Sequence, residues 1–206
     1  GQLSCEKATF DGGDGPALRA HRLDVVGSVS LRDGFSAIGL VDLNGSKIGG
    51  QLDCSNATLN AGTCPAFTAH RLDVVGSVFL RHGFSAKGLV DLTGSKIGGQ
   101  LVCASGKFTG ELRLQEVAVT GLFFWTNVIC QVEKLDLRYA SVGALVDDLE
   151  SWNNTKWCDL RGFEYGSVRS SLSVQQRLTW LEKPANPENA LNSEREKRGV
   201  FPQDID

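Results

Sequence analysis

Apolar and polar residues alternate along this chain in very short stretches. Pairs of apolar or small residues recur at positions i and i+2, and successive pairs begin five or six residues apart. Examples are Val29/Leu31, Phe35/Ala37, Val41/Leu43, Ser46/Ile48 and Leu52/Cys54. Alternation over three residues predicts a short strand that turns two side chains to the same side. Gly, Ser or Asn usually follows each pair, which predicts a corner where the chain bends.

The pattern also repeats over a longer interval of 49 residues. Residues 21–29 return at 70–78, and residues 45–50 return at 94–99. Each short strand would form one face of a coil. A 49-residue unit contains eight such faces if the loop Asn60–Pro65 obscures one of them, and eight faces make two coils of four. One coil cannot bury apolar side chains alone, whereas coils stacked about 4.8 Å apart share an interior and pair their backbones. The repeat therefore predicts an all-β solenoid of parallel strands. An antiparallel sandwich is the alternative, but it needs longer strands.

The third unit departs from the first two after Cys103 and lacks the long loop. Its apolar pairs continue to Ala144, which predicts about six coils and a solenoid domain over residues 1–145. The next residues contain Trp152, Trp157, Phe163 and Tyr165. Large aromatic side chains suit a cap over the last coil, where apolar surface and unpaired backbone would otherwise be exposed.

We therefore expect a small aromatic cap over residues 146–183, with a short α-helix at its end. The helix is predicted over Leu172–Lys183, with an apolar stripe on one side. The predicted stripe consists of Leu172, Val174, Leu178 and Leu181. Residues 184–206 are polar, contain three prolines and are predicted to form a tail.

Particular runs resemble known repeat proteins. The run from Val41 to Gly50 resembles pentapeptide repeats, which form a right-handed, four-sided parallel β-helix. Gly49–Ser55 and Gly76–Arg81 resemble the repeats of bacterial proteins often labelled membrane-associated oxidoreductases. The later runs Leu145–Asp148, Leu160–Tyr165 and Arg177–Leu181 resemble the same set. The resemblance covers most of residues 1–182 and implies a bacterial source. It also implies that any membrane segment lies outside these residues.

Charge and composition narrow the function. The net charge is −3, and residues 1–145 contain 13 basic and 13 acidic side chains. A neutral solenoid argues against direct nucleic-acid binding and against mimicry of DNA, by which some pentapeptide proteins act on topoisomerases. No apolar run approaches the roughly 18 residues of a membrane span. The chain begins inside a repeat unit, so we expect it to be a piece of a longer protein.

Six cysteines show no spacing typical of a metal site. Cys5, Cys54 and Cys103 share one repeat position two coils apart, about 9.6 Å, which is too far for disulfides between them. They are predicted to be buried thiols, so a reduced, cytoplasmic protein is favoured. Cys64, in the long loop, is the expected exposed thiol, and a bridge from it to Cys54 is the alternative.

The candidate catalytic residues are explained by duplication. His21 and His70 share a repeat position, and His82 stands where the first unit has Asp33. The repeat positions imply no Ser/His/Asp or Cys/His set, and no nucleotide-binding glycine motif is present. The Gly-rich run from Asp11 to Gly15 loses its carboxylates in the second unit, which argues against a calcium loop.

Charged side chains recur at outward positions in both units. These pairs are Asp42/Asp91, Lys47/Lys96, Asp24/Asp73 and Arg32/Arg81. We expect them to form a solvated face with weak ion pairs. Outer carboxylates of a carbohydrate-processing β-helix are the alternative, but such enzymes use clefts made by long loops.

The sequence thus predicts a non-catalytic scaffold or protein-binding rod with no catalytic, cofactor or metal site, acting on an unidentified protein partner. The alternatives are a topoisomerase-directed DNA mimic and an enzyme such as the oxidoreductase of the family label. An uncapped N-terminal end would also permit end-to-end self-association.

Overall fold

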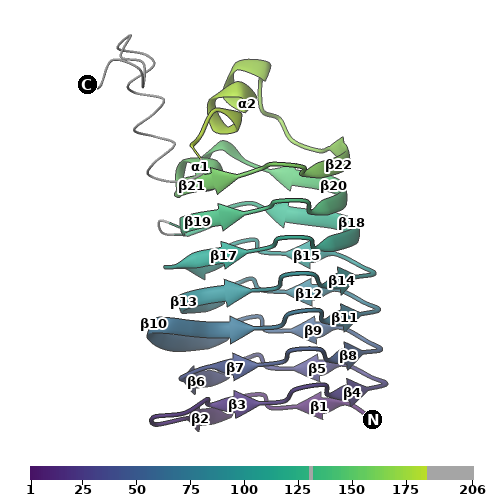
Figure 1. The fold of residues 1–206 in the computed structure, drawn as a ribbon, viewed down its shortest axis with the longest axis vertical. Helices are drawn as coiled ribbons and strands as arrows, with labels where there is room; N and C mark the ends of the chain where they lie inside the picture. Colours follow the sequence, from purple (N-terminus) through teal and green to yellow (C-terminus); the bar gives the residue numbers. More distant parts are fainter. Residues whose placement is uncertain (130–131, 185–206) are drawn as a thin grey trace, which may run out of the picture.

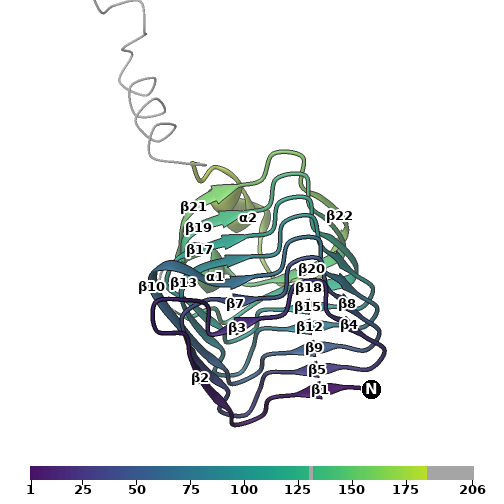
Figure 2. The same ribbon diagram turned by 60° about the horizontal axis from the view of Figure 1, so that its bottom comes forward.

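The computed structural model describes residues 1–129 and 132–184. It is a parallel β-solenoid of about seven turns, with the N-terminus at one end and two short helices at the other (Figure 1). Every strand pair is parallel, and each turn contributes strands to four separate ladders. Followed away from the viewer in Figure 2, the chain winds clockwise, so the solenoid is right-handed. The sequence prediction of the fold is confirmed.

The four ladders are named here in chain order. The first contains β1 (Leu3–Ser4), β5 (Val29–Ser30), β9 (Leu52–Asp53), β12 (Val78–Phe79), β15 (Leu101–Val102) and the C-terminal parts of β18 (Ala118–Trp125) and β20 (Ser141–Asp147). The second contains β2 (Thr9–Asp11), β6 (Ser36–Ile38), the N-terminal parts of β10 (Thr58–Thr68) and β13 (Ser85–Asp91), and β16 (Lys107–Phe108).

The other two ladders follow in the same way. The third contains β3 (Leu18–Arg19), β7 (Val41–Asp42), the C-terminal parts of β10 and β13, β17 (Glu111–Arg113), β19 (Val132–Asp136) and β21 (Thr155–Asp159). The fourth contains β4 (Asp24–Val25), β8 (Lys47–Ile48), β11 (Asp73–Val74), β14 (Lys96–Ile97) and the N-terminal parts of β18, β20 and β22 (Glu164–Val168). The C-terminal part of β22 continues the first ladder.

The interior is filled by the side chains that alternate inward along these short strands. Leu31, Cys54, Leu80 and Cys103 stack in one inward column, and each is at most 1% exposed. The eighth face, which the long loop obscures in the sequence, is also present, because Ala66, Phe67 and Ala69 are buried. The inward positions read from the i, i+2 pairs are therefore confirmed.

The corner between the third and fourth ladders has one residue with a positive φ in each turn. These residues are Arg22, Gly45, Arg71, Gly94, Glu116, Tyr139 and Gly162. Only glycine adopts this left-handed conformation without a steric cost, so this row of backbone defines the corner whatever side chain it carries. Seven such residues mark seven turns.

The number of turns exceeds the predicted six. Strands β21 and β22 pair with β19 and β20, so the ladders continue beyond residue 145. The sequence pattern missed this turn because Trp157 and Tyr165 interrupt the run of small apolar pairs. The division of the chain at residues 145 and 183 stays a prediction, and the tail beyond residue 184 lies outside the described residues.

Two short helices cover the last turn. Helix α1 spans Leu149–Asn153, and α2 spans Val174–Leu181. Ser173 caps α2, because its hydroxyl accepts from the backbone N–H of Gln176 while the Gln176 side chain accepts from the backbone of Ser173. Asp148 caps α1 in a similar way.

An aromatic stack joins these helices to the core. The Trp180 ring lies parallel to that of Trp152 with centroids 4.0 Å apart, and Trp152 lies 6.3 Å from Trp125. Leu172, just before α2, is partly buried against the core. The predicted apolar stripe is wrong for its other three members: Val174 is 79% exposed, and Leu178 and Leu181 are also exposed. The reason is that the large indole of Trp180 buries more area than any aliphatic side chain of the helix, and it sets the inward face.

Candidate binding groove

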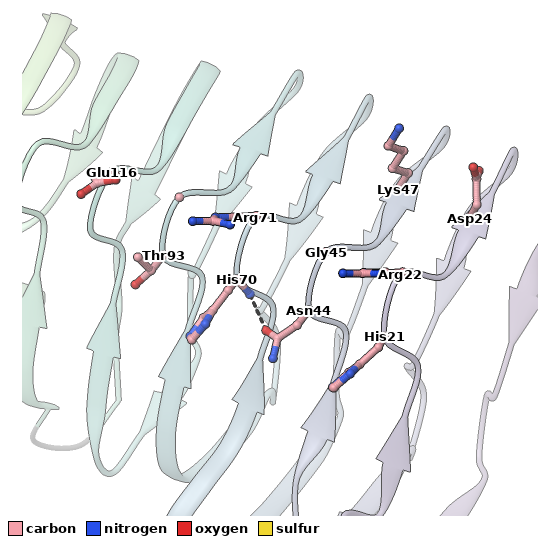
Figure 3. Close-up of a pocket in the computed structure, with 11 residues that line it drawn as sticks. His21, Arg22, Asp24, Asn44, Gly45, Lys47, His70, Arg71, Thr93 and Glu116 are labelled. Carbon is pink, nitrogen blue, oxygen red and sulfur yellow. Dashed lines mark hydrogen bonds between the residues drawn. The ribbon is translucent and has the colours of Figure 1, made fainter.

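A groove of about 780 Å³, lined mainly by polar and charged residues, runs over the surface of the solenoid. It runs along the corner between the third and fourth ladders, from His21 in the first turn to Glu116 in the fifth (Figure 3). We call it the corner groove. Since each turn places its outward side chains at the same corner, the groove is a direct product of the repeat.

Alternate turns contribute two different sets of side chains to the corner groove. The first and third turns supply His21-Arg22 and His70-Arg71, whereas the second and fourth supply Asn44-Gly45 and Thr93-Gly94. A Cβ atom added to Gly45 would lie 3.5 Å from Cγ of Arg22, and one added to Gly94 would lie 3.6 Å from Cγ of Arg71. Each arginine therefore extends along the axis over the glycine of the next turn, as Figure 3 shows.

Each histidine of the corner groove contacts a carboxylate of the following turn. Nε2 of His70 lies 3.0 Å from Oδ2 of Asp91, and His21 pairs with Asp42 in the same way. The imidazoles are half exposed, while the carboxylates lie beneath them. The backbone N–H of His70 also donates to Oδ1 of Asn44 at 2.7 Å, so neighbouring turns are linked across the groove (Figure 3).

The prediction of a solvated face is wrong for these carboxylates. Asp42 is 6% exposed and Asp91 is 2% exposed, because the side chains of adjacent turns cover them. The backbone N–H of Thr93 and its hydroxyl both donate to Asp91, and Arg113 reaches it from the next turn at 3.2 Å. Burial alone raises the pKa of Asp91, but hydrogen bonds from Thr93 and His70 outweigh it and hold the pKa below its usual value.

The buried aspartates of the third ladder also hold the corner backbone. Each accepts a hydrogen bond from the N–H two residues later: Asn44 at 3.0 Å, Thr93 at 2.9 Å, Arg138 at 3.2 Å and Arg161 at 3.4 Å. This is an Asx turn, in which the carboxylate replaces a backbone acceptor. The four aspartates are therefore structural, and Asp42 and Asp91 also orient the histidines that contact them.

Among the described residues of the corner groove, the two histidines contact carboxylates within 4.0 Å, whereas Arg22, Arg71 and Glu116 make no ion pair. Lys47 stands in register between Asp24 and Asp73 on the fourth ladder, so opposite charges alternate there. Within residues 1–129 and 132–184, Arg22 and Arg71 have no carboxylate within 4.0 Å. The groove therefore presents two free guanidinium groups on one side.

The chemistry of the groove does not assemble a nucleophile. The Nε2 atoms of His21 and His70 are engaged by carboxylates, and the hydroxyl of Thr93, which lines the groove, donates to Asp91 at 2.6 Å. No group of three His, Cys, Asp or Glu side chains suited to a metal ion occurs in the described part of the chain. The arrangement is suited to binding an anion.

The other candidates lie elsewhere. His82 takes a positive φ in the corner between the first and second ladders, in the same column as Asp33 and Asn56. Asp11 accepts from the N–H of Gly13 at 2.9 Å and so closes its own turn. Arg81 stacks on the ring of Phe79, with 4.1 Å from Cζ to the centroid.

The described cysteines are all free thiols. Cys54 and Cys103 are buried, and burial raises their pKa well above the usual range. Cys64 is exposed and unbridged, as the loop prediction expected. The prediction of burial is wrong for Cys5, which is partly exposed because it lies in the first turn and has no turn before it to cover it. The sixth, Cys130, lies outside the described residues.

The pairing of histidine with aspartate was missed from the sequence. In both pairs the aspartate follows the histidine by 21 residues. This separation is close to the length of one coil, and it is the signal from which the contact could have been predicted. The side chains are not opposite each other in the ladder, since Leu18 pairs with Val41 and so places Arg19 opposite Asp42. Only the diagonal reach of the imidazole brings them together.

Comparison with known proteins gives no match to any protein-family model, curated protein or solved structure. The solenoid itself agrees with the fold implied by the resemblance to pentapeptide repeats. No helix in the described ranges combines the length and apolarity that crossing a membrane requires.

Proposed function

We propose that this chain is a non-catalytic β-solenoid scaffold that binds a protein partner along the corner groove. The observation that supports this most is the repetition of one polar module, His-Arg followed by Asn-Gly or Thr-Gly, at equal intervals on the rod. Parallel ladders and a continuous buried core hold these modules in fixed positions. A rigid, repetitive surface binds a partner with little loss of its own conformational entropy.

The alternatives have less support. A DNA mimic needs an acidic surface, whereas the solenoid is neutral and its groove has two uncompensated arginines. An enzyme needs an activated nucleophile or a positioned acid and base, and the histidines here are already paired with structural carboxylates. We place the scaffold in the bacterial cytoplasm, as part of a longer protein related to pentapeptide-repeat proteins, on the sequence resemblance alone.

Site-specific photocrosslinking in the source cells tests the proposal. A photoreactive amino acid replaces Lys47, which lines the groove, or Lys87, which is exposed on the second ladder as a matched control. We expect a defined crosslinked partner from position 47 only, lost when Arg22 and Arg71 are changed to Gln, and reproduced with the purified partner. Equal products from both positions, or none from position 47, would contradict the proposal.

A further inference from the structure

Each of the first five turns places one residue with a positive φ in the corner groove, and the charges of these residues follow a regular order along the axis. Arg22 and Arg71 occupy it in the first and third turns, Gly45 and Gly94 in the second and fourth, and Glu116 in the fifth. Two turns of a parallel ladder advance about 9.6 Å. A ligand lying along the groove therefore meets positive, positive and negative groups at equal steps of that length.

Few peptide conformations present side chains on one face at this interval. In an extended strand, residues three apart point to opposite faces. In an α-helix, side chains seven apart advance about 10.5 Å, and the mismatch grows with each step. In the polyproline II conformation, every third residue returns to the same face after about 9.3 Å, which matches the groove within a fraction of an ångström.

We propose that the corner groove binds an acidic polyproline II segment of a protein partner, with carboxylates at positions i and i+3 and a cation at position i+6. The carboxylates pair with Arg22 and Arg71, and the cation pairs with Glu116. This inference rests on the proposed scaffold function and adds the conformation and charge order of the ligand. The spacing gives the interaction its specificity, because each exposed pair contributes little on its own.

The chemistry of the groove fits such a ligand. Arg22 and Arg71 are exposed, and each guanidinium can donate two parallel hydrogen bonds to a carboxylate. A polyproline II peptide is already ordered before binding, so it loses little entropy in a shallow groove. Asn44 lies in the turn between the two arginines and Thr93 in the turn between Arg71 and Glu116, and both add polar groups to the groove (Figure 3).

Two labelled peptides of identical composition test the charge order. Fluorescence anisotropy at low salt compares Glu-Pro-Pro-Glu-Pro-Pro-Lys with Glu-Pro-Pro-Lys-Pro-Pro-Glu on the full chain. We expect the first peptide to bind about tenfold more tightly, because the second places like charges at Arg71 and Glu116. The variants Arg22→Gln and Arg71→Gln should each weaken it severalfold, while Lys87→Gln, far from the groove, should not.

A charge reversal completes the test. Glu116→Lys should transfer the preference to Glu-Pro-Pro-Glu-Pro-Pro-Glu, since the third position then requires a carboxylate. Equal binding of the two isomeric peptides would overturn the spacing and leave the groove as a general anion-binding surface. Failure of both peptides to bind, with a partner still crosslinked at position 47, would overturn this inference and leave the scaffold function standing.

Discussion

Arg177 of α2 holds the cap on the solenoid through Asp147. Its guanidinium donates two hydrogen bonds, of 3.1 and 3.3 Å, to the two carboxylate oxygens of Asp147. Asp147 occupies the inward column that holds Cys103 and Trp125 in the preceding turns, and its side chain is fully buried. A charge thus stands at the end of an apolar column, and it is compensated by a residue thirty positions later.

Breaking this pair should release α2. Arg177→Met leaves the Asp147 carboxylate buried with only Trp152 Nε1 as a donor, at 2.7 Å. We expect a loss of about 3–5 kcal/mol in the stability of the cap, seen as faster hydrogen exchange in α2 and altered tryptophan fluorescence. The double variant Arg177→Met/Asp147→Leu restores an apolar column and should recover most of the loss. A double variant as unstable as the single one would show that the ion pair itself is required.

A charge in the interior should unfold the rod. Leu80 is 0% exposed, and Leu80→Asp places an unpaired carboxylate in the shared core at a cost of several kcal/mol. Leu178→Asp is the matched control, because Leu178 is 44% exposed and its change should cost less than about 1 kcal/mol. Urea unfolding followed by circular dichroism measures both. Similar midpoints for the two variants would contradict the inward assignment of Leu80.

Removing α2 should expose a surface that associates. A chain ending at residue 168 lacks Trp180, which covers Trp152 in the native stack. We expect this truncated chain to form dimers or larger assemblies through its C-terminal end, whereas a control ending at residue 184 keeps the cap. Light scattering across a range of concentrations compares them. A stable monomer of the shorter chain would show that α2 is not needed as a cap.

Acid should destabilise the third ladder through its buried carboxylates. Burial raises the pKa of Asp136, but hydrogen bonds from Arg138 and the charge of Lys134 outweigh it and keep the pKa below its usual value. Since the folded pKa is depressed, this stabilisation is complete above the unfolded pKa of about 3.9 and is lost as the pH falls through the folded value.

The variant Asp136→Asn tests this contribution. We expect it to be less stable than the wild type at pH 7 and to lose less stability between pH 5 and pH 3. Urea midpoints at several pH values give both quantities. An unchanged acid dependence would assign the effect to other carboxylates, such as Asp91 and Asp159, whose pKa values are also lowered.

The solenoid was predictable from the sequence because its core obeys a local rule. Residues such as Leu80 and Cys103 face inward through strand alternation, and the 49-residue repeat reveals their stacking without any long-range information. The groove was not predictable in the same way. The contact of His70 with Asp91 depends on the diagonal reach of the imidazole to the next turn. The burial of Asp91 also depends on Arg113, which lies in the turn after that of Asp91.

The cap shows a related limit. The apolar pattern of α2 favoured Leu178 and Leu181, yet the helix turns Trp180 inward. A helix of eight residues has too few apolar positions to fix its own orientation, so the stacking surface offered by Trp152 decides it.

The positive φ angles of Arg22 and Arg71 lower the stability of the solenoid, whereas the side chains of these residues supply the positive charge of the groove. An L-residue in the left-handed region costs about 1–2 kcal/mol relative to glycine, and the second and fourth turns avoid that cost with Gly45 and Gly94. Replacing both arginines with glycine should therefore yield a rod that resists denaturation better and binds nothing along this corner. Selection for stability alone would replace these two arginines with glycine. The free energy of unfolding that the chain loses at these two positions is therefore the cost of keeping a charged surface.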